Sequence, residues 1–146
     1  YTDGSFDEEL NYYSYGIVLF LPGNLKPLYF SRALKDKKYI ESRNVSGEIF
    51  AALRAIDLAV SNDLKNIMIC HDYIGVEKWL TREWKTNTNI SKHYLEEYQE
   101  KYEGKINVEF KHVKAHTGDL YNEKADELAF NAIAKIKRLT LIDEEF

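Results

Sequence analysis

The chain has 146 residues, of which 45% are hydrophobic, 14% aromatic and 30% charged, and its net charge is −4. This length and apolar fraction fit one globular domain and exclude a disordered, collagen-like or low-complexity chain. The longest apolar run, Gly16 to Leu21, is far below the roughly 20 residues of a membrane span, so we expect no membrane partner. The negative net charge excludes nucleic-acid binding through bulk positive charge and leaves local basic surfaces or bound metal ions.

The cysteine content and the first residues of the chain indicate its cellular environment and its relation to a longer protein. A single cysteine, Cys70, excludes an internal disulfide and a cysteine-based zinc cluster. A reducing, intracellular environment suits this composition, and we expect a cytoplasmic protein. The first residues, Tyr1 to Ser5, include no initiator Met and no signal sequence but read as a strand, so we expect a piece of a longer protein.

The first third of the chain predicts strands. Tyr1–Ser5, Tyr12–Phe20 and Leu28–Leu34 are rich in strand-forming residues, and Pro22-Gly23-Asn24 is typical of a turn. These segments predict an antiparallel meander. Residues 39–43 are polar and predict a loop.

From Val45 the apolar period becomes helical, and one stripe continues to Val60 before Ser61-Asn62-Asp63 ends the helix. The elements expected after it are a strand at Asn66–Cys70, a short helix at Tyr73–Leu80, a helix at Ile90–Tyr102, a strand around Ile106, Val108 and Phe110, a helix at Leu120–Ile136, and a frayed acidic tail at 143–146. Strands followed by alternating helices and strands predict a mixed α/β sheet with helices on its faces. We expect a single domain over 1–146, with a core at 1–137 and a tail at 138–146.

Four carboxylates fall at informative places in these elements. Asp3 lies in the first strand, Asp72 follows the Asn66–Cys70 strand, Glu48 lies in the first turn of the long helix, and Asp126 lies early in the last helix. Each alone is more often a turn, cap or solvated residue. Together they would repel one another unless cations held them, and hard oxygen ligands select Mg²⁺ or Mn²⁺. Two such ions about 4 Å apart can clamp a phosphodiester for attack by water.

Five sequence blocks strengthen this interpretation. Thr2-Asp3-Gly4-Ser5, Gly47–Ala52, Asp72-Tyr73, Val113–Gly118 and Asn122–Ala129 resemble, in order, the type 1 ribonuclease H family over residues 1 to about 137. The resemblance implies a ribonuclease H-like fold with a five-stranded mixed sheet and helices on both faces. It implies hydrolysis of the RNA strand of an RNA/DNA hybrid, which leaves 5′-phosphate and 3′-hydroxyl ends.

The resemblance also assigns residues. It places the ligands of two Mg²⁺ or Mn²⁺ ions at Asp3, Glu48, Asp72 and Asp126. A mobile-loop histidine that is linked to proton transfer or product release falls on His116, whose ordinary pKa near neutrality suits both tasks.

Substrate contacts are expected at Gly4 and Ser5 beside Asp3, and at residues further along the chain. Asn44 matches an asparagine that contacts the minor groove, although an N-cap role fits it equally well. Trp84, in a polar stretch with Asn87, is a better candidate for the DNA strand than Trp79, which we expect in the core. Ser91 could belong to a phosphate pocket.

The stretch from Leu80 to Ile90 is too short for the basic protrusion that many cellular relatives carry. The segment 75–85 resembles a bacterial subgroup that often has a separate N-terminal hybrid-binding module. We therefore expect a monomer that binds hybrids weakly and in a salt-sensitive way, or with the help of such a module. Two alternatives stay open, namely a catalytically inactive hybrid-binding module and another nuclease on the same fold that cuts DNA.

Overall fold

The computed structural model of the protein describes residues 1–115 and 117–145. Its elements, in chain order, are β1 (Thr2–Asp7), β2 (Tyr12–Leu19), β3 (Leu28–Leu34), the 3₁₀ helix η1 (Ile40–Ser42), α1 (Asn44–Ser61), β4 (Asn66–His71), α2 (Gly75–Lys78), α3 (Asn89–Lys101), β5 (Asn107–His112) and α4 (Leu120–Glu145). The predicted element order is confirmed. Two details were wrong, because η1 interrupts the expected loop and α4 extends to Glu145 instead of ending at Ile136.

The strands form two sheets. β1, β2 and β3 pair as the expected antiparallel meander, and β4 pairs in parallel with β5. The prediction of one five-stranded sheet is therefore wrong. A cavity of about 300 Å³ is lined by residues of β1, β2, α1 and β4, with Thr2 and Cys70 in its wall, and no strand ladder joins β1 to β4 among the described residues.

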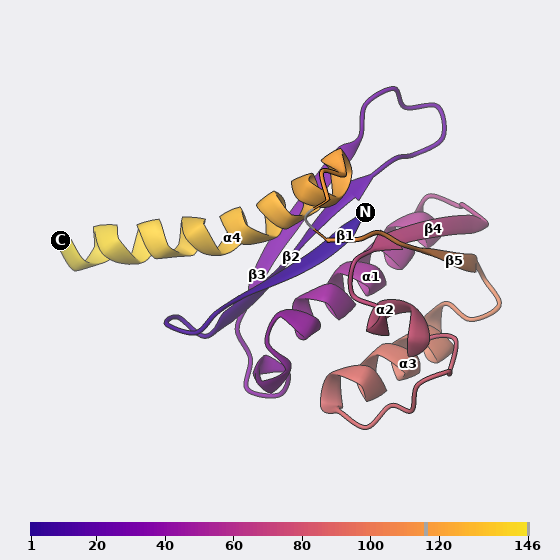
Figure 1. The fold of residues 1–146 in the computed structure, drawn as a ribbon, viewed down its shortest axis with the longest axis horizontal. Helices are drawn as coiled ribbons and strands as arrows, with labels where there is room; N and C mark the ends of the chain where they lie inside the picture. Colours follow the sequence, from indigo (N-terminus) through magenta and orange to yellow (C-terminus); the bar gives the residue numbers. More distant parts are fainter. Residues whose placement is uncertain (116, 146) are drawn as a thin grey trace.

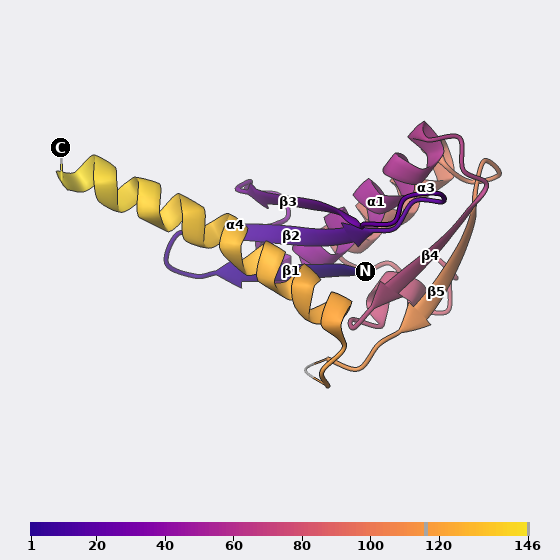
Figure 2. The same cartoon turned by 90° about the horizontal axis from the view of Figure 1, so that it is seen from above.

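Helices cover both faces of the β1–β3 sheet. α1 lies on one face and α4 on the other, while α2 and α3 pack on the side of α1, and the C-terminal half of α4 projects beyond the sheet (Figure 1 and Figure 2). The middle strand β2 is buried along nearly its whole length. Within it Ile17 packs toward Ala51 of α1, whereas the Ser14 hydroxyl donates to the Ala129 carbonyl of α4 at 2.6 Å. A strand covered on both faces explains its continuous apolar sequence.

The largest hydrophobic cluster lies between α1, β4, α2 and α3. It includes Ile49, Ile56, Ile69 and Trp79, and the predicted core position of Trp79 is confirmed. Among the described residues, none of the helices combines the length and apolarity needed to cross a bilayer.

Two glycines let α1 approach the sheet closely. A Cβ atom at Gly47 would lie 2.0 Å from the Ser14 carbonyl oxygen, and one at Gly4 would lie 2.4 Å from the Glu48 backbone nitrogen. Both distances are shorter than any ordinary contact. The first turn of α1 therefore rests directly on β1 and β2, which brings Glu48 beside Asp3.

Candidate metal centre

Three carboxylates from three elements converge at one point. Asp3 of β1, Glu48 of α1 and Asp72 after β4 each offer an oxygen, and these oxygens all lie within 4.8 Å of one another. Asp3 and Glu48 are buried, and Asp72 is half-buried. The sequence prediction that these three acids meet is consistent with this arrangement, and a divalent cation is the ligand that it fits.

Asp126 and Asn122, both on α4, lie at the edge of this group. Asp126 is half-buried and contributes to the raised pKa of Asp3, but it is not one of the three acids that share the 4.8 Å limit. The buried Asn122 amide donates to Asp72 Oδ2 at 3.4 Å. The backbone N–H of Asn122 in turn donates to the Asp119 carboxylate at 3.0 Å, which fixes the start of the helix. α4 thus carries one acid and one amide to the site.

The protein environment disfavours charge on the two buried acids when metal is absent. Burial raises the pKa of Asp3 to about 7, and the nearby charge of Asp72 adds to the rise. Burial also raises the pKa of Glu48 well above its ordinary value, and its proximity to Asp3 raises it further. Like charges held close in a desolvated site retain protons until a cation replaces them.

The donor set fits a hard divalent cation. Glu48 Oε2 is buried without a hydrogen-bond partner, so this acid retains an unsatisfied oxygen. Among the described residues, no Lys or Arg forms an ion pair with Asp3, Glu48, Asp72 or Asp126. Protons therefore offset the charge of the two buried acids in the metal-free protein, and a bound divalent cation would replace them.

The expected substrate residues near the acids lie in different surroundings. Gly4 packs against the first turn of α1, and its N–H donates to Asp3 Oδ1 at 2.9 Å. Ser5 is half-buried beside α4, in a small cavity of about 60 Å³. Asn44 is exposed as the first residue of α1, and the start of that helix lacks a side-chain cap, so the N-cap interpretation was wrong.

The remaining expected contacts lie on or before α3. Trp84 is 41% exposed and meets the buried Trp79 edge to face at 6.0 Å. Asn87 is exposed. Ser91 is buried, and it forms a capping box with Thr88, so its hydroxyl already serves the start of α3. His116 lies outside the described residues.

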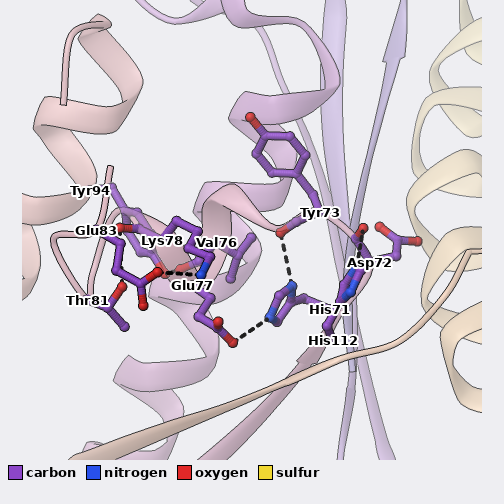
Figure 3. A network of polar contacts seen from close by, with 10 residues as sticks. All are labelled: His71, Asp72, Tyr73, Val76, Glu77, Lys78, Thr81, Glu83, Tyr94 and His112. Atoms are coloured by element: carbon purple, nitrogen blue, oxygen red, sulfur yellow. Dashed lines mark hydrogen bonds and ion pairs between the residues drawn. The ribbon is translucent and has the colours of Figure 1, made fainter. Parts of the chain in front are cut away.

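Sequence reasoning did not identify the polar network behind Asp72. Figure 3 shows His71 and His112 beside the turn that carries this acid. His71 was interpreted as an ordinary strand-end residue, and His112 as structural. Asn122 was quoted only as part of a motif. Their positions behind the site follow from the pairing of β4 with β5 and the packing of α4, neither of which a single residue reveals.

The fold and the acidic site define a mixed α/β protein with a candidate site for divalent cations. The family model for RNase H matches residues 1–134, and the chain belongs to the ribonuclease H family, whose members are hydrolases. A ribonuclease H from Francisella tularensis subsp. novicida is 29% identical over 143 residues, covering 93% of this chain and 90% of its own.

Solved structures show the same fold. RNase H1 from the archaeon Halobacterium salinarum is similar with a TM-score of 0.74 and 25% identity, and the match covers 92% of this chain and 96% of that one. LC11-RNase H1, solved in complex with an RNA/DNA hybrid, has a TM-score of 0.73 and 20% identity, covering 93% and 96% of the two chains. The latter supports the fold alone.

Proposed function

We propose that this protein is an endoribonuclease that hydrolyses the RNA strand of RNA/DNA hybrids with two Mg²⁺ or Mn²⁺ ions, leaving 5′-phosphate and 3′-hydroxyl ends. The observation that carries the proposal is the convergence of Asp3, Glu48 and Asp72 within 4.8 Å in a member of the ribonuclease H family. The unsatisfied Glu48 oxygen supports cation binding at that point.

The side chains would divide the work by their position. Asp3 and Glu48, on rigid elements, would hold the buried side of the metal site, while the half-buried Asp72 and Asp126 would hold the side that faces solvent. Bound divalent ions supply an activated water and stabilise the charge on the leaving oxygen. Asn122 would orient Asp72, and His116 would assist proton transfer or product release.

Hybrid recognition is proposed to depend on shape and on the 2′-hydroxyl. The exposed Asn44 lies four residues before Glu48, so its amide could both donate to and accept from the minor groove next to the cut. The exposed ring of Trp84, with Asn87 nearby in the chain, offers a surface for the DNA strand. We propose that the protein acts as a monomer in the cytoplasm, and that an N-terminal hybrid-binding module would raise its affinity.

The test is cleavage of a labelled RNA/DNA duplex, with and without Mg²⁺, followed by mapping of the product ends. Wild type should cut only the RNA strand and only with metal. D72N should lose cleavage by about 10²-fold or more while remaining folded, because a charged ligand is replaced by a neutral one of the same size.

D63N is the matched control. Asp63 is exposed just after α1 with φ of 57°, a conformation that asparagine tolerates well, so this variant should cut like wild type. Binding of the hybrid without cutting would instead support an inactive binding module. Cutting of an all-DNA duplex would support a different nuclease activity on this fold.

A further inference from the structure

The turn that carries Asp72 has hydrogen bonds to three consecutive carbonyl oxygens. The carbonyl of His71 accepts from the Val113 N–H at 2.7 Å. The carbonyl of Asp72 accepts from His112 Nε2 at 3.3 Å, and the carbonyl of Tyr73 accepts from His71 Nδ1 at 3.0 Å. Figure 3 shows both imidazoles at this turn. The backbone on either side of Asp72 is therefore held in place.

The bond from His71 is the sheltered one. Its side chain is fully buried, and the ring meets Phe110 of β5 edge to face at 5.9 Å. A carbonyl oxygen can only accept, so Nδ1 must carry the proton. This bond runs from residue 71 to residue 73 and closes a ring around Asp72.

The bond from His112 is weaker, as judged by the burial of the ring and the length of the bond. His112 is exposed, and its distance to the Asp72 carbonyl is longer. Water competes more strongly for the bond of an exposed ring than for that of a buried ring. The Asp72 carboxylate itself receives one long bond from the Asn122 amide, at 3.4 Å. The direction of this carboxylate therefore depends mainly on its backbone.

We propose that His71 is a positioning residue for the metal centre, and that its Nδ1–H bond to the Tyr73 carbonyl aims the Asp72 carboxylate at Asp3 and Glu48. The inference rests on the proposed function, in which Asp72 is a metal ligand. Residues behind a metal ligand commonly change metal affinity by about 10- to 100-fold when they are replaced.

Two substitutions of similar polarity separate the two ring nitrogens. In H71N the amide nitrogen can occupy the place of Nδ1, whereas in H71Q the amide lies further out, near the place of Nε2. We expect H71N to bind Mn²⁺ within about threefold of wild type, and H71Q to bind it about tenfold or more weakly. Calorimetric titration of the metal-free protein with MnCl₂ measures this directly. With hybrid, H71Q should need more metal for half-maximal cleavage while the KM for the hybrid stays unchanged.

Y94F is the matched structural control. The buried Tyr94 hydroxyl donates to the Val76 carbonyl at 2.7 Å, so this variant also loses a buried bond to a nearby backbone carbonyl. It should lower the urea midpoint but leave Mn²⁺ affinity unchanged. Equal Mn²⁺ affinity in folded H71Q and wild type would overturn the inference, as would a tenfold loss in folded H71N. If H71Q does not fold, H71L, which fills similar space without a donor, takes its place and should show the same tenfold loss relative to H71N. Cleavage by D72N at the wild-type rate would overturn the proposed function instead.

Discussion

Replacing Asp3 with Asn should stabilise the metal-free protein at pH 8. Burial raises the pKa of Asp3 from an ordinary 3.8 to about 7, so the folded protein binds a proton more tightly than the unfolded chain does. Stability is then lost as pH rises from about 4 to about 7, and the whole cost is present above that range. A shift of this size corresponds to about 4 kcal/mol at most.

Asn keeps the shape and avoids the charge. Its side-chain oxygen can still accept the Gly4 N–H bond, which is 2.9 Å long in the wild type. D3N should therefore unfold at higher urea than wild type at pH 8 in EDTA, and the difference should shrink toward pH 5, where wild-type Asp3 is protonated. With saturating Mg²⁺ the order should reverse, because D3N lacks a ligand that the metal-bound wild type uses.

The matched control is D7N, in the same strand. The hydrogen-bonded Lys137 ammonium, with Nζ 2.6 Å from Asp7 Oδ2, lowers the pKa of Asp7, so this carboxylate stabilises the fold at neutral pH and loses that effect in acid. D7N should therefore be destabilised at pH 8, the opposite sign to D3N. A D3N variant that is no more stable than wild type at pH 8 in EDTA, or whose advantage is independent of pH, would contradict a buried charge at Asp3 as the cause.

Three further outcomes are expected. Mn²⁺ affinity should increase from pH 6 to pH 8, because the raised pKa values of Asp3 and Glu48 mean that metal binding releases protons. Calorimetry in two buffers of different ionisation enthalpy counts those protons. G47A should lower the free energy of unfolding by about 1–3 kcal/mol or more, because its Cβ would meet the Ser14 carbonyl oxygen, and urea unfolding measures this loss. W84A should weaken hybrid binding by about 1–3 kcal/mol with little change in stability, because it removes the exposed ring. W84F keeps an aromatic ring and should bind nearly as well as wild type. Fluorescence anisotropy in the D72N background measures the hybrid affinity of both variants.

The positions of the acids within their elements could be predicted from sequence because each depends on local pattern. A carboxylate after a short apolar strand, such as Asp72, faces the end of a sheet, and a carboxylate at a helix start, such as Glu48, can meet it. The separation of the sheets could not be predicted. Whether β1 and β4 pair depends on a backbone distance, and the apolar patterns of Tyr1–Ser5 and Asn66–Cys70 fit both arrangements.

The end of α4 and the capping box of α3 were not predicted, and both have local causes. The apolar stripe weakens after Ile136, which suggested an end, but no Gly or Pro follows and helix-forming residues continue, so α4 continues to Glu145. Ser91 resembled a phosphate ligand by its position in the chain. The Thr88 side chain three residues earlier was the available signal for a capping box.

Because the two sheets are separate, the acidic site also lies at the junction between them. Asp3 belongs to the β1–β3 sheet, whereas Asp72 follows β4 of the other, and no backbone ladder joins those strands among the described residues. Glu48 lies on α1, which packs against β1 and β4. Repulsion among these acids therefore acts across the junction of the two sheets. Divalent ions held there would attract both sides, so we expect the same charges that serve hydrolysis also to join the two sheets when metal is bound.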